Sequence, residues 1–265
     1  MPKVRVNGIE MYYEELGTGE PLILIMGFGG DHLAWAFQVR AFAERYRVVT
    51  FDNRGVGQTD APERPSTTRE MAEDTLALMG ALGIERAHVI GASMGGMIAQ
   101  EVALAHPSRV RTLHLACTMA RPDAHMKALI ATWRAMRTAL SREELVRAMV
   151  LWLFSFRTYD ARPEFVETVI QTALANPYPQ SVPGFLGQAA AIEGHDALAR
   201  LPAIRCPTLV TVAEDDILVP PRFSRELAAR IPGATLRAVV EAGHVYFWER
   251  PDEFNALCLD FVGKH

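Results

Sequence analysis

The stretch HVIGASMGGMIAQ, residues 88–100, joins a short apolar run to a helical pattern through GASMG at 91–95. These five residues fit G-x-S-x-G, in which a buried strand turns sharply into a helix and leaves the serine on a strained backbone. Small residues at 91 and 95 let the strand and the helix approach closely. The stretch therefore predicts a nucleophile elbow that presents Ser93 at the top of a sheet.

Short apolar runs alternate with helical patterns on both sides of this motif. Runs typical of strands buried on both faces occupy 22–26, 47–51, 87–90, 110–115, 208–212 and 235–240. Helical patterns between them include 68–82, which ends at Gly83, and 94–105, which ends before Pro107. This alternation predicts an α/β fold with parallel strands and right-handed crossovers.

Two segments depart from the alternation. Near the start, Asn7-Gly8 separates the alternating stretches 4–6 and 10–15, which predicts a hairpin whose antiparallel strands join one edge of the sheet. From 123 to 201 only helical periodicity is found, so we expect a cap domain there, an all-helical insertion into a core formed by 1–122 and 202–265.

The cap segment contains two helix signals. Ser141 to Glu144 form a capping box that opens a helix predicted to run through Phe156. Asp160 with Pro163 opens another helix toward Ala175. Some of the many large apolar side chains in this segment should face the carboxyl ends of the strands, where open α/β sheets bind ligands.

The composition excludes several classes of protein. The chain has 265 residues, 49% of them hydrophobic and 22% charged, and a formal charge of −4, which argues against a nucleic-acid partner. Cys117, Cys206 and Cys258 form no C-x-x-C pair, so neither a zinc site nor a dithiol centre is expected. The first residues lack the apolar stretch of a signal peptide, and no apolar run is long enough to span a bilayer. We expect a cytoplasmic protein without a membrane partner.

A serine hydroxyl becomes a nucleophile when a base removes its proton, and in this architecture the acid and then the histidine follow the serine along the chain. His244 follows the last strand pattern, which places it at the same edge of the sheet as Ser93. His195, in the cap segment, is a weaker candidate for lining the site. The acid should follow the strand at 208–212, where Glu214, Asp215 and Asp216 compete and spacing alone does not choose.

Five ordered motifs together resemble the α/β-hydrolase superfamily over essentially the whole chain. They are IMGFGGD (25–31), FDNRGVGQTD (51–60), GASMGG (91–96), AEDDILVP (213–220) and GHVYFWERPDEF (243–254). The resemblance implies a mostly parallel eight-stranded sheet with helices on both faces. In the family pattern the acid stands four residues before a proline, which matches Asp216 with Pro220 and favours a triad of Ser93, Asp216 and His244.

The resemblance also implies an oxyanion hole made by the backbone N–H groups of Phe28 and Met94. The family has a His-Gly pair after this strand, whereas Met26-Gly27 stands here. A main-chain donor survives that change, but the bracing of the loop is then an open question. Asp52 and Arg54 match a family loop with a structural role.

These parts predict a serine esterase or lactonase. His244 would activate Ser93 to attack a small to medium carboxylic ester or lactone, and the acyl-enzyme would be hydrolysed with no cofactor or metal. A serine nucleophile, in place of aspartate, argues against the haloalkane dehalogenase and epoxide hydrolase branches. The expected partner is a small-molecule substrate, contacted by Trp133, Arg134 and Trp152, and the sequence leaves a homo-oligomer open.

The same motifs are compatible with related activities. The alternatives are an acyl-homoserine lactonase, an enol-lactonase, a carbon–carbon bond hydrolase, a cofactor-free perhydrolase, and a ligand receptor of this fold with low turnover. An arginine such as Arg134 that binds a substrate carboxylate would suit an enol-lactonase.

Overall fold

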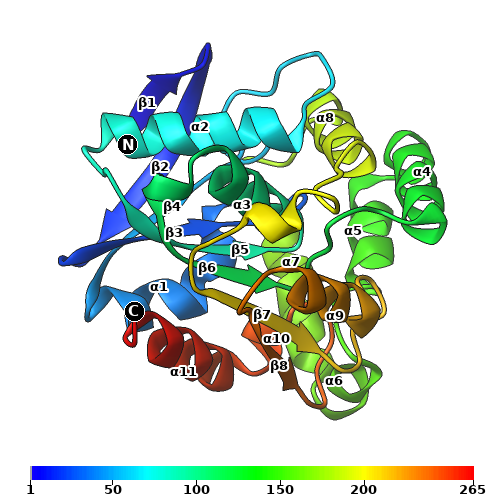
Figure 1. Ribbon diagram of the computed structural model, residues 1–265. Helices are drawn as coiled ribbons and strands as arrows, with labels where there is room; N and C mark the ends of the chain where they lie inside the picture. Colours follow the sequence, from blue (N-terminus) through cyan, green and yellow to red (C-terminus); the bar gives the residue numbers. More distant parts are fainter. Residues whose placement is uncertain (1) are drawn as a thin grey trace.

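A computed structural model describes residues 2–265, and its centre is an eight-stranded sheet (Figure 1). The strand order is β1-β2-β4-β3-β5-β6-β7-β8. The strands are β1 (Lys3–Val6), β2 (Ile9–Leu16), β3 (Glu20–Ile25), β4 (Tyr46–Phe51), β5 (Ala87–Ala92), β6 (Val110–Ala116), β7 (Thr208–Ala213) and β8 (Thr235–Val239). The pairs of β1 with β2 and of β2 with β4 are antiparallel, and the five other pairs are parallel. The predicted mostly parallel sheet is confirmed.

The hairpin at the start of the chain forms where Asn7-Gly8 predicts it. Both turn residues have positive φ, 45° at Asn7 and 82° at Gly8, a conformation that asparagine and glycine adopt at low cost. Val6 pairs with Ile9 across this turn. Strand β2 continues past the hairpin and pairs with β4, so the hairpin extends the sheet at one edge.

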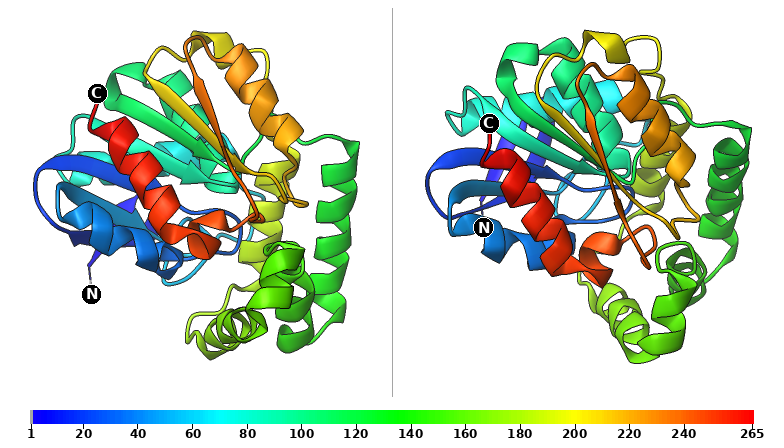
Figure 2. Two further views of the ribbon diagram at one scale, coloured as in Figure 1. Left: turned by 90° about the horizontal axis from the view of Figure 1, so that it is seen from below. Right: turned by 60° about the horizontal axis from the view of Figure 1, so that its bottom comes forward.

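Helices cover both faces of the sheet, as Figures 1 and 2 show. Helices α1 and α11 pack together on one face, and α2 and α3 pack together on the other. The core helices are α1 (Ala36–Ala43), α2 (Thr68–Ala81), α3 (Met94–Ala105), α9 (Pro221–Arg230), α10 (Tyr246–Glu249) and α11 (Pro251–Val262), with 3₁₀ turns η1 (His32–Trp35), η2 (Pro107–Arg109) and η3 (Leu201–Ala203).

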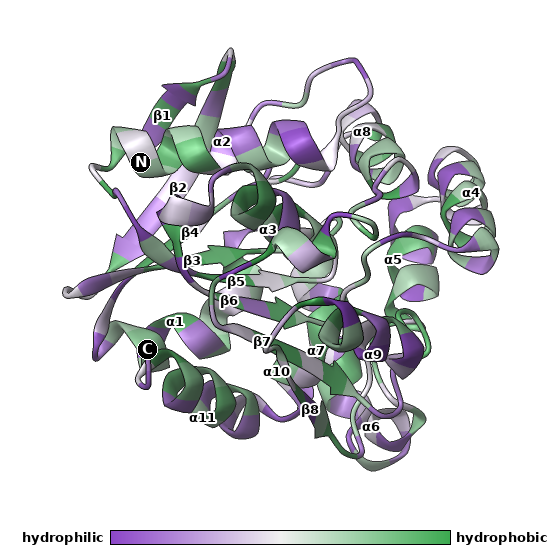
Figure 3. Ribbon diagram, in the orientation of Figure 1, coloured by the Kyte–Doolittle hydropathy of each residue, from purple (hydrophilic) through white to green (hydrophobic). Residues whose placement is uncertain are grey.

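Strand β3 shows why the apolar runs do not alternate with polar residues. Leu22 and Leu24 pack in the cluster beneath α1 and α11, whereas Ile23 and Ile25 pack in the cluster beneath α2 and α3. Because successive side chains of a strand point to opposite faces, a strand covered on both faces is apolar throughout. Figure 3 shows these central strands as largely hydrophobic and the outer surfaces of the helices as mixed.

Five helices lie between β6 and β7, and we refer to them as the cap helices. They are α4 (Ala124–Ala139), α5 (Arg142–Val150), α6 (Phe156–Ala161), α7 (Pro163–Ala175) and α8 (Val182–Glu193). Figure 2 shows them gathered at one end of the sheet, beside the carboxyl ends of the parallel strands. The cap helices therefore lie at the edge where open α/β sheets bind ligands (Figure 2).

The capping-box helix is shorter than predicted, and this prediction was wrong at its C-terminal end. The box at Ser141 is present, but α5 ends at Val150 instead of Phe156. Beyond it, the carbonyl of Leu153 accepts a hydrogen bond from the Val245 N–H at 3.1 Å, and the Ser155 side chain caps the next helix, α6. Contacts with a segment about 90 residues away in sequence therefore end the helix.

The second predicted cap helix runs from Pro163 to Ala175 as expected, but Asp160 takes no part in opening it. Asp160 lies within α6, and α7 begins at Pro163 without a side-chain cap. A proline in the first turn needs no such cap for its own nitrogen, because it has no N–H to satisfy. Within residues 2–265, none of the helices combines the length and hydropathy needed to cross a membrane.

Candidate active site

Ser93 occupies the turn between β5 and α3 with φ 56° and ψ −121°. A non-glycine residue with positive φ is strained, and such strain persists where the surroundings hold it. Here the Ser93 N–H donates to the carbonyl of Ala116 on β6 at 2.9 Å, and the Thr118 hydroxyl donates to the Ser93 carbonyl at 2.7 Å. The predicted sharp turn is present, and the end of β6 together with Thr118, which follows it, holds both of its peptide groups.

His244 and Asp216 form a buried pair. The Nδ1 atom of His244 lies 2.9 Å from Oδ2 of Asp216, and both residues are less than 5% exposed. The other carboxylate oxygen, Oδ1, accepts hydrogen bonds from the N–H groups of Leu218 at 2.9 Å and Val219 at 2.8 Å. Asp216 is therefore held in one orientation, with Oδ2 facing the histidine ring.

The two competing acids lie elsewhere. The Asp215 carboxylate contacts the Arg157 guanidinium at 3.3 Å, and Glu214 is exposed. Of the three acids that the spacing left open, only Asp216 contacts His244 among the described residues.

The loop that carries His244 is anchored by Glu249, a residue that the motifs alone did not single out. Its buried carboxylate accepts hydrogen bonds from the Gly243 N–H, from the Ser155 N–H at 2.9 Å and from the Thr158 hydroxyl at 2.6 Å. These donors come from the histidine loop and from the cap. Glu249 lies within the GHVYFWERPDEF motif, but only the folded chain shows that it joins the two.

The loop after β3 lies directly against the serine. A Cβ atom at Gly27 would be 2.9 Å from Cβ and 3.5 Å from Oγ of Ser93, so a side chain at 27 would occupy the space beside the hydroxyl. The preceding carbonyl, of Met26, accepts a hydrogen bond from the Asn53 side chain at 2.8 Å. A side chain from the loop after β4 thus braces the segment in which methionine replaces the family's histidine.

The loop after β3 at residues 26–30, which we call the glycine loop, is followed along the chain by the elbow and then by the buried acid–histidine pair, the order expected for one family. A family model described as alpha/beta hydrolase fold matches residues 20–251. This chain is an α/β hydrolase. It is also 34% identical over 265 residues to a protein of Azorhizobium caulinodans named "Putative carbamate hydrolase RutD", which covers 100% of this chain and 99% of that protein.

Solved structures of hydrolytic enzymes are similar over their full length. A thermophilic esterase from Thermogutta terrifontis superposes with a TM-score of 0.89 and 28% identity, covering 100% of this chain and 99% of that one. The enol-lactonase from Burkholderia xenovorans LB400 superposes with a TM-score of 0.91 and 28% identity, covering 99% and 100%. This α/β hydrolase is accordingly an enzyme of the hydrolase class.

Three aromatic rings meet above the glycine loop of the hydrolase. The Phe28 ring stacks on Trp133 of α4 with a centroid distance of 5.9 Å, and it meets Phe185 of α8 edge-on at 4.7 Å. Trp133 is 3% exposed, and its indole nitrogen has no hydrogen-bond partner among residues 2–265. The structure therefore brings Trp133 to the loop beside Ser93 and leaves a buried donor there.

Arg134 and Trp152, the other two residues predicted to contact the substrate, have other partners in the folded chain. The Arg134 guanidinium pairs with Glu193 of α8 at 2.8 Å, so its charge is already neutralised. Trp152 is half-buried and packs against the core cluster beneath α2 and α3. The α/β-hydrolase loop at 51–60 has the structural contacts expected of it, since the buried Arg54 pairs with Asp74 at 2.5 Å.

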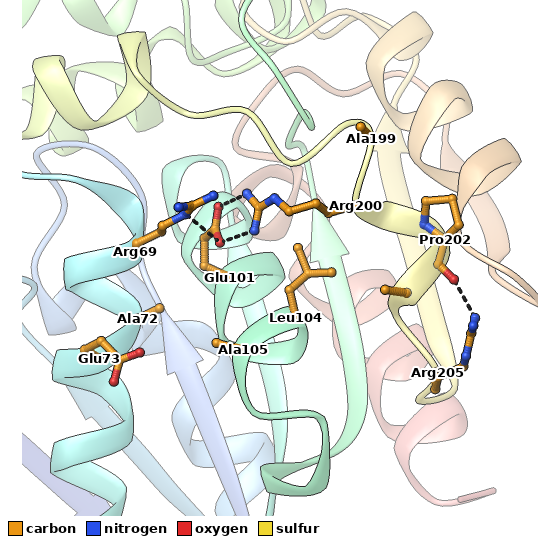
Figure 4. Close-up of a pocket in the computed structure, with 11 residues that line it drawn as sticks. Arg69, Ala72, Glu73, Glu101, Leu104, Ala105, Ala199, Arg200, Pro202 and Arg205 are labelled. Atoms are coloured by element: carbon orange, nitrogen blue, oxygen red, sulfur yellow. Dashed lines mark hydrogen bonds and ion pairs between the residues drawn. The ribbon is translucent and has the colours of Figure 1, made fainter.

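His195 lies away from the acid–histidine pair. Its Nδ1 atom is 3.0 Å from the Thr68 hydroxyl and 3.7 Å from the Glu101 carboxylate. Glu101 also faces a surface pocket of about 630 Å³, shown in Figure 4, where Arg69 and Arg200 both point toward its carboxylate. Ser93, Asp216 and His244 do not line this pocket, so we do not assign the hydrolase chemistry to it.

The buried His195 predicts a loss of stability in acid. Burial lowers its pKa from 6.5 to about 4, so between these values the unfolded chain binds more protons than the folded one. Stability should thus fall as the pH drops from about 6.5 to about 4, by about 3 kcal/mol from this group. Urea unfolding at pH 7 and pH 4.5 should show a smaller loss for His195→Gln than for wild type.

The exposed His106 supplies the control for this measurement. His106→Gln should lose as much stability as wild type between the two pH values, and an equal loss in His195→Gln would contradict the prediction. Burial also lowers the pKa of His114, to about 3, so this residue destabilises the folded chain in acid as well. In His195→Gln the loss of stability in acid should therefore become smaller but should not vanish.

Proposed function

We propose that this hydrolase cleaves uncharged carboxylic esters or lactones of small to medium size through an acyl-enzyme on Ser93. The observation that carries the proposal is the buried pair of His244 and Asp216, 2.9 Å apart, in a chain whose serine sits on a strained turn after the central strand β5. Similarity to an esterase and to an enol-lactonase supports the same class of reaction.

The proposed chemistry follows from the hydrogen bonds of the pair. Because Asp216 accepts from Nδ1–H, the ring nitrogen Nε2 of His244 is left without a proton and acts as the base toward the Ser93 hydroxyl. Ser93 Oγ then attacks the carbonyl carbon, and the N–H groups of Phe28 and Met94 stabilise the oxyanion. His244 returns the proton to the leaving alcohol, and water, activated by the same base, hydrolyses the acyl-enzyme.

The residues around the glycine loop favour an uncharged acyl group. Phe28, Trp133 and Phe185 pack their rings together beside the loop, and ligand sites lined by aromatic side chains favour apolar groups with a few polar contacts. The unpartnered indole N–H of Trp133 suits a substrate oxygen. Arg134 is paired with Glu193, so we place no substrate carboxylate at Arg134, in contrast to the simplest enol-lactonase hypothesis.

A substrate panel tests this proposal. It contains p-nitrophenyl butyrate, a γ-lactone, an acyl-homoserine lactone, a carbamate ester and a dicarboxylate enol-lactone. We expect multiple turnovers with an uncharged ester or lactone, and kcat/KM at least about tenfold lower for the dicarboxylate. Arg134→Ala should leave the activity on p-nitrophenyl butyrate within about twofold of wild type.

Two outcomes would contradict the proposal. Preference for the dicarboxylate, lost selectively in Arg134→Ala, would identify an enol-lactonase that binds its substrate's charge. Stoichiometric labelling of Ser93 without turnover of any panel member would instead favour a ligand receptor of the same fold.

A further inference from the structure

One glutamine of the cap helices reaches down to the glycine loop. Gln188 on α8 is fully buried, and its Oε1 atom accepts hydrogen bonds from the Gly29 N–H at 2.9 Å and from Nε2 of Gln180 at 3.0 Å. Its own Nε2 donates to the carbonyl of Arg54 at 3.0 Å. The side chain thus joins the loop after β3, the loop after β4 and the cap helices.

The peptide groups of the glycine loop are held one after another. Asn53 binds the carbonyl of Met26, and the Gly30 N–H donates to the carbonyl of Gly27 at 3.3 Å. In a trans peptide the C=O and the N–H point in opposite directions, so the Phe28 N–H points away from Gly30. Within residues 2–265 this N–H donates to no protein group. The next N–H, that of Gly29, is the one that Gln188 holds.

From these contacts we propose that Gln188 is a positioning residue for the oxyanion hole. The inference rests on the proposed function, in which the Phe28 N–H stabilises the developing oxyanion. Gly29 has φ 71°, and the hydrogen bond from its N–H to Gln188 restrains the Phe28–Gly29 peptide, which adjoins the Gly27–Phe28 peptide that carries the Phe28 N–H. The cap helices thereby keep the Phe28 donor in place before substrate binds, which is the arrangement that lowers the barrier most.

An amide is the side chain that this place requires. Its oxygen accepts hydrogen bonds from two N–H groups and its nitrogen donates one to a carbonyl, so this place needs an acceptor and a donor on one side chain. A thioether of similar length would leave the Gly29 N–H free. A carboxylate would still accept from Gly29 but would place an oxygen against the Arg54 carbonyl.

A simple structural tie between cap and core is the competing explanation, and Gln180 provides the matched control. Its Nε2 also joins cap to core, donating to the carbonyl of Gly55 at 3.1 Å, but it makes no bond to Gly29. Gln180→Met therefore removes the donor to Gly55 and the second donor to Gln188, but it leaves the hydrogen bond from the Gly29 N–H to Gln188 in place.

The test compares Gln188→Met with Gln180→Met at a temperature at which both are folded. For Gln188→Met we expect kcat for p-nitrophenyl butyrate to fall about 10- to 100-fold with KM within about threefold. The inhibition constant of an alkylboronic acid, which forms a tetrahedral adduct with serine, should rise by a similar factor. Gln180→Met should lower the melting temperature while kcat stays within about threefold.

Amide hydrogen exchange of residues 26–32 provides a readout that does not depend on activity. Exchange at Gly29 should accelerate in Gln188→Met and stay slow in Gln180→Met. If Gln188→Met does not fold, Gln188→Asn takes its place, because a side chain shorter by one methylene should also weaken the hydrogen bond to Gly29. Gln188→Glu, which keeps an acceptor for Gly29, should recover most of the lost kcat.

The outcomes separate this inference from the proposed function. Equal changes of kcat, inhibition constant and Gly29 exchange in Gln188→Met and Gln180→Met would overturn the positioning role while leaving the hydrolase activity intact. A wild-type enzyme without Ser93-dependent turnover would overturn the proposed function, and the exchange comparison would then still decide whether Gln188 holds Gly29.

Discussion

Ser93→Ala is expected to lower kcat for p-nitrophenyl butyrate by at least about 10⁴-fold, because Ser93 forms the acyl-enzyme in the proposed mechanism. Alanine keeps the β5–α3 turn, and both backbone hydrogen bonds of residue 93 remain available, to Ala116 and from Thr118. The loss should therefore appear in the chemical step, without a matching fall in stability. Steady-state kinetics together with thermal melting would measure both.

Ser108→Ala is the matched control, since Ser108 is an exposed serine in the η2 turn. It should keep full activity. After reaction with a fluorophosphonate probe, which labels activated serines, fragmentation mass spectrometry should place the label on Ser93 and on no other serine, Ser108 included. Residual turnover above about 1% of wild type in Ser93→Ala would show that another residue carries the reaction.

Asp216→Asn should lower kcat by about 10³- to 10⁴-fold, the second largest effect we expect. The reason lies in the two N–H groups, of Leu218 and Val219, that bind Oδ1. An asparagine would keep its oxygen toward these donors, so its NH₂ group would face His244 and donate to Nδ1. The ring would then carry its proton on Nε2, the atom that accepts the proton of Ser93 in the proposed mechanism.

Asp215→Asn is the control, because its carboxylate contacts Arg157 near the surface. This variant should keep kcat within about threefold of wild type, since exposed ion pairs contribute little. Nitrogen-15 NMR of the histidine rings would report the tautomer directly. A ring of His244 still protonated at Nδ1 in Asp216→Asn would refute the explanation even if activity fell.

Local sequence signals predict the elements but not always where they end. The Asn7-Gly8 turn, the strands and the start of α3 follow from backbone preferences that act within a few residues. The helix opened by Ser141 ends early because Leu153 and Ser155 bind the loop of His244, and no short-range pattern contains that information.

The chain alone determines which chemistry is within reach: a serine on a tight strand-to-helix turn, followed in order by an acidic loop and a histidine loop, in a fold set by buried strands. The folded molecule decides which carboxylate contacts the histidine, because it brings Asp216 against His244, 28 positions further along, and leaves Asp215 beside Arg157. It also pairs Arg134 with Glu193 and places Gln188 and Glu249 between cap and core. Those contacts join residues as far as 159 positions apart, and such distances close only when the helices pack on the sheet.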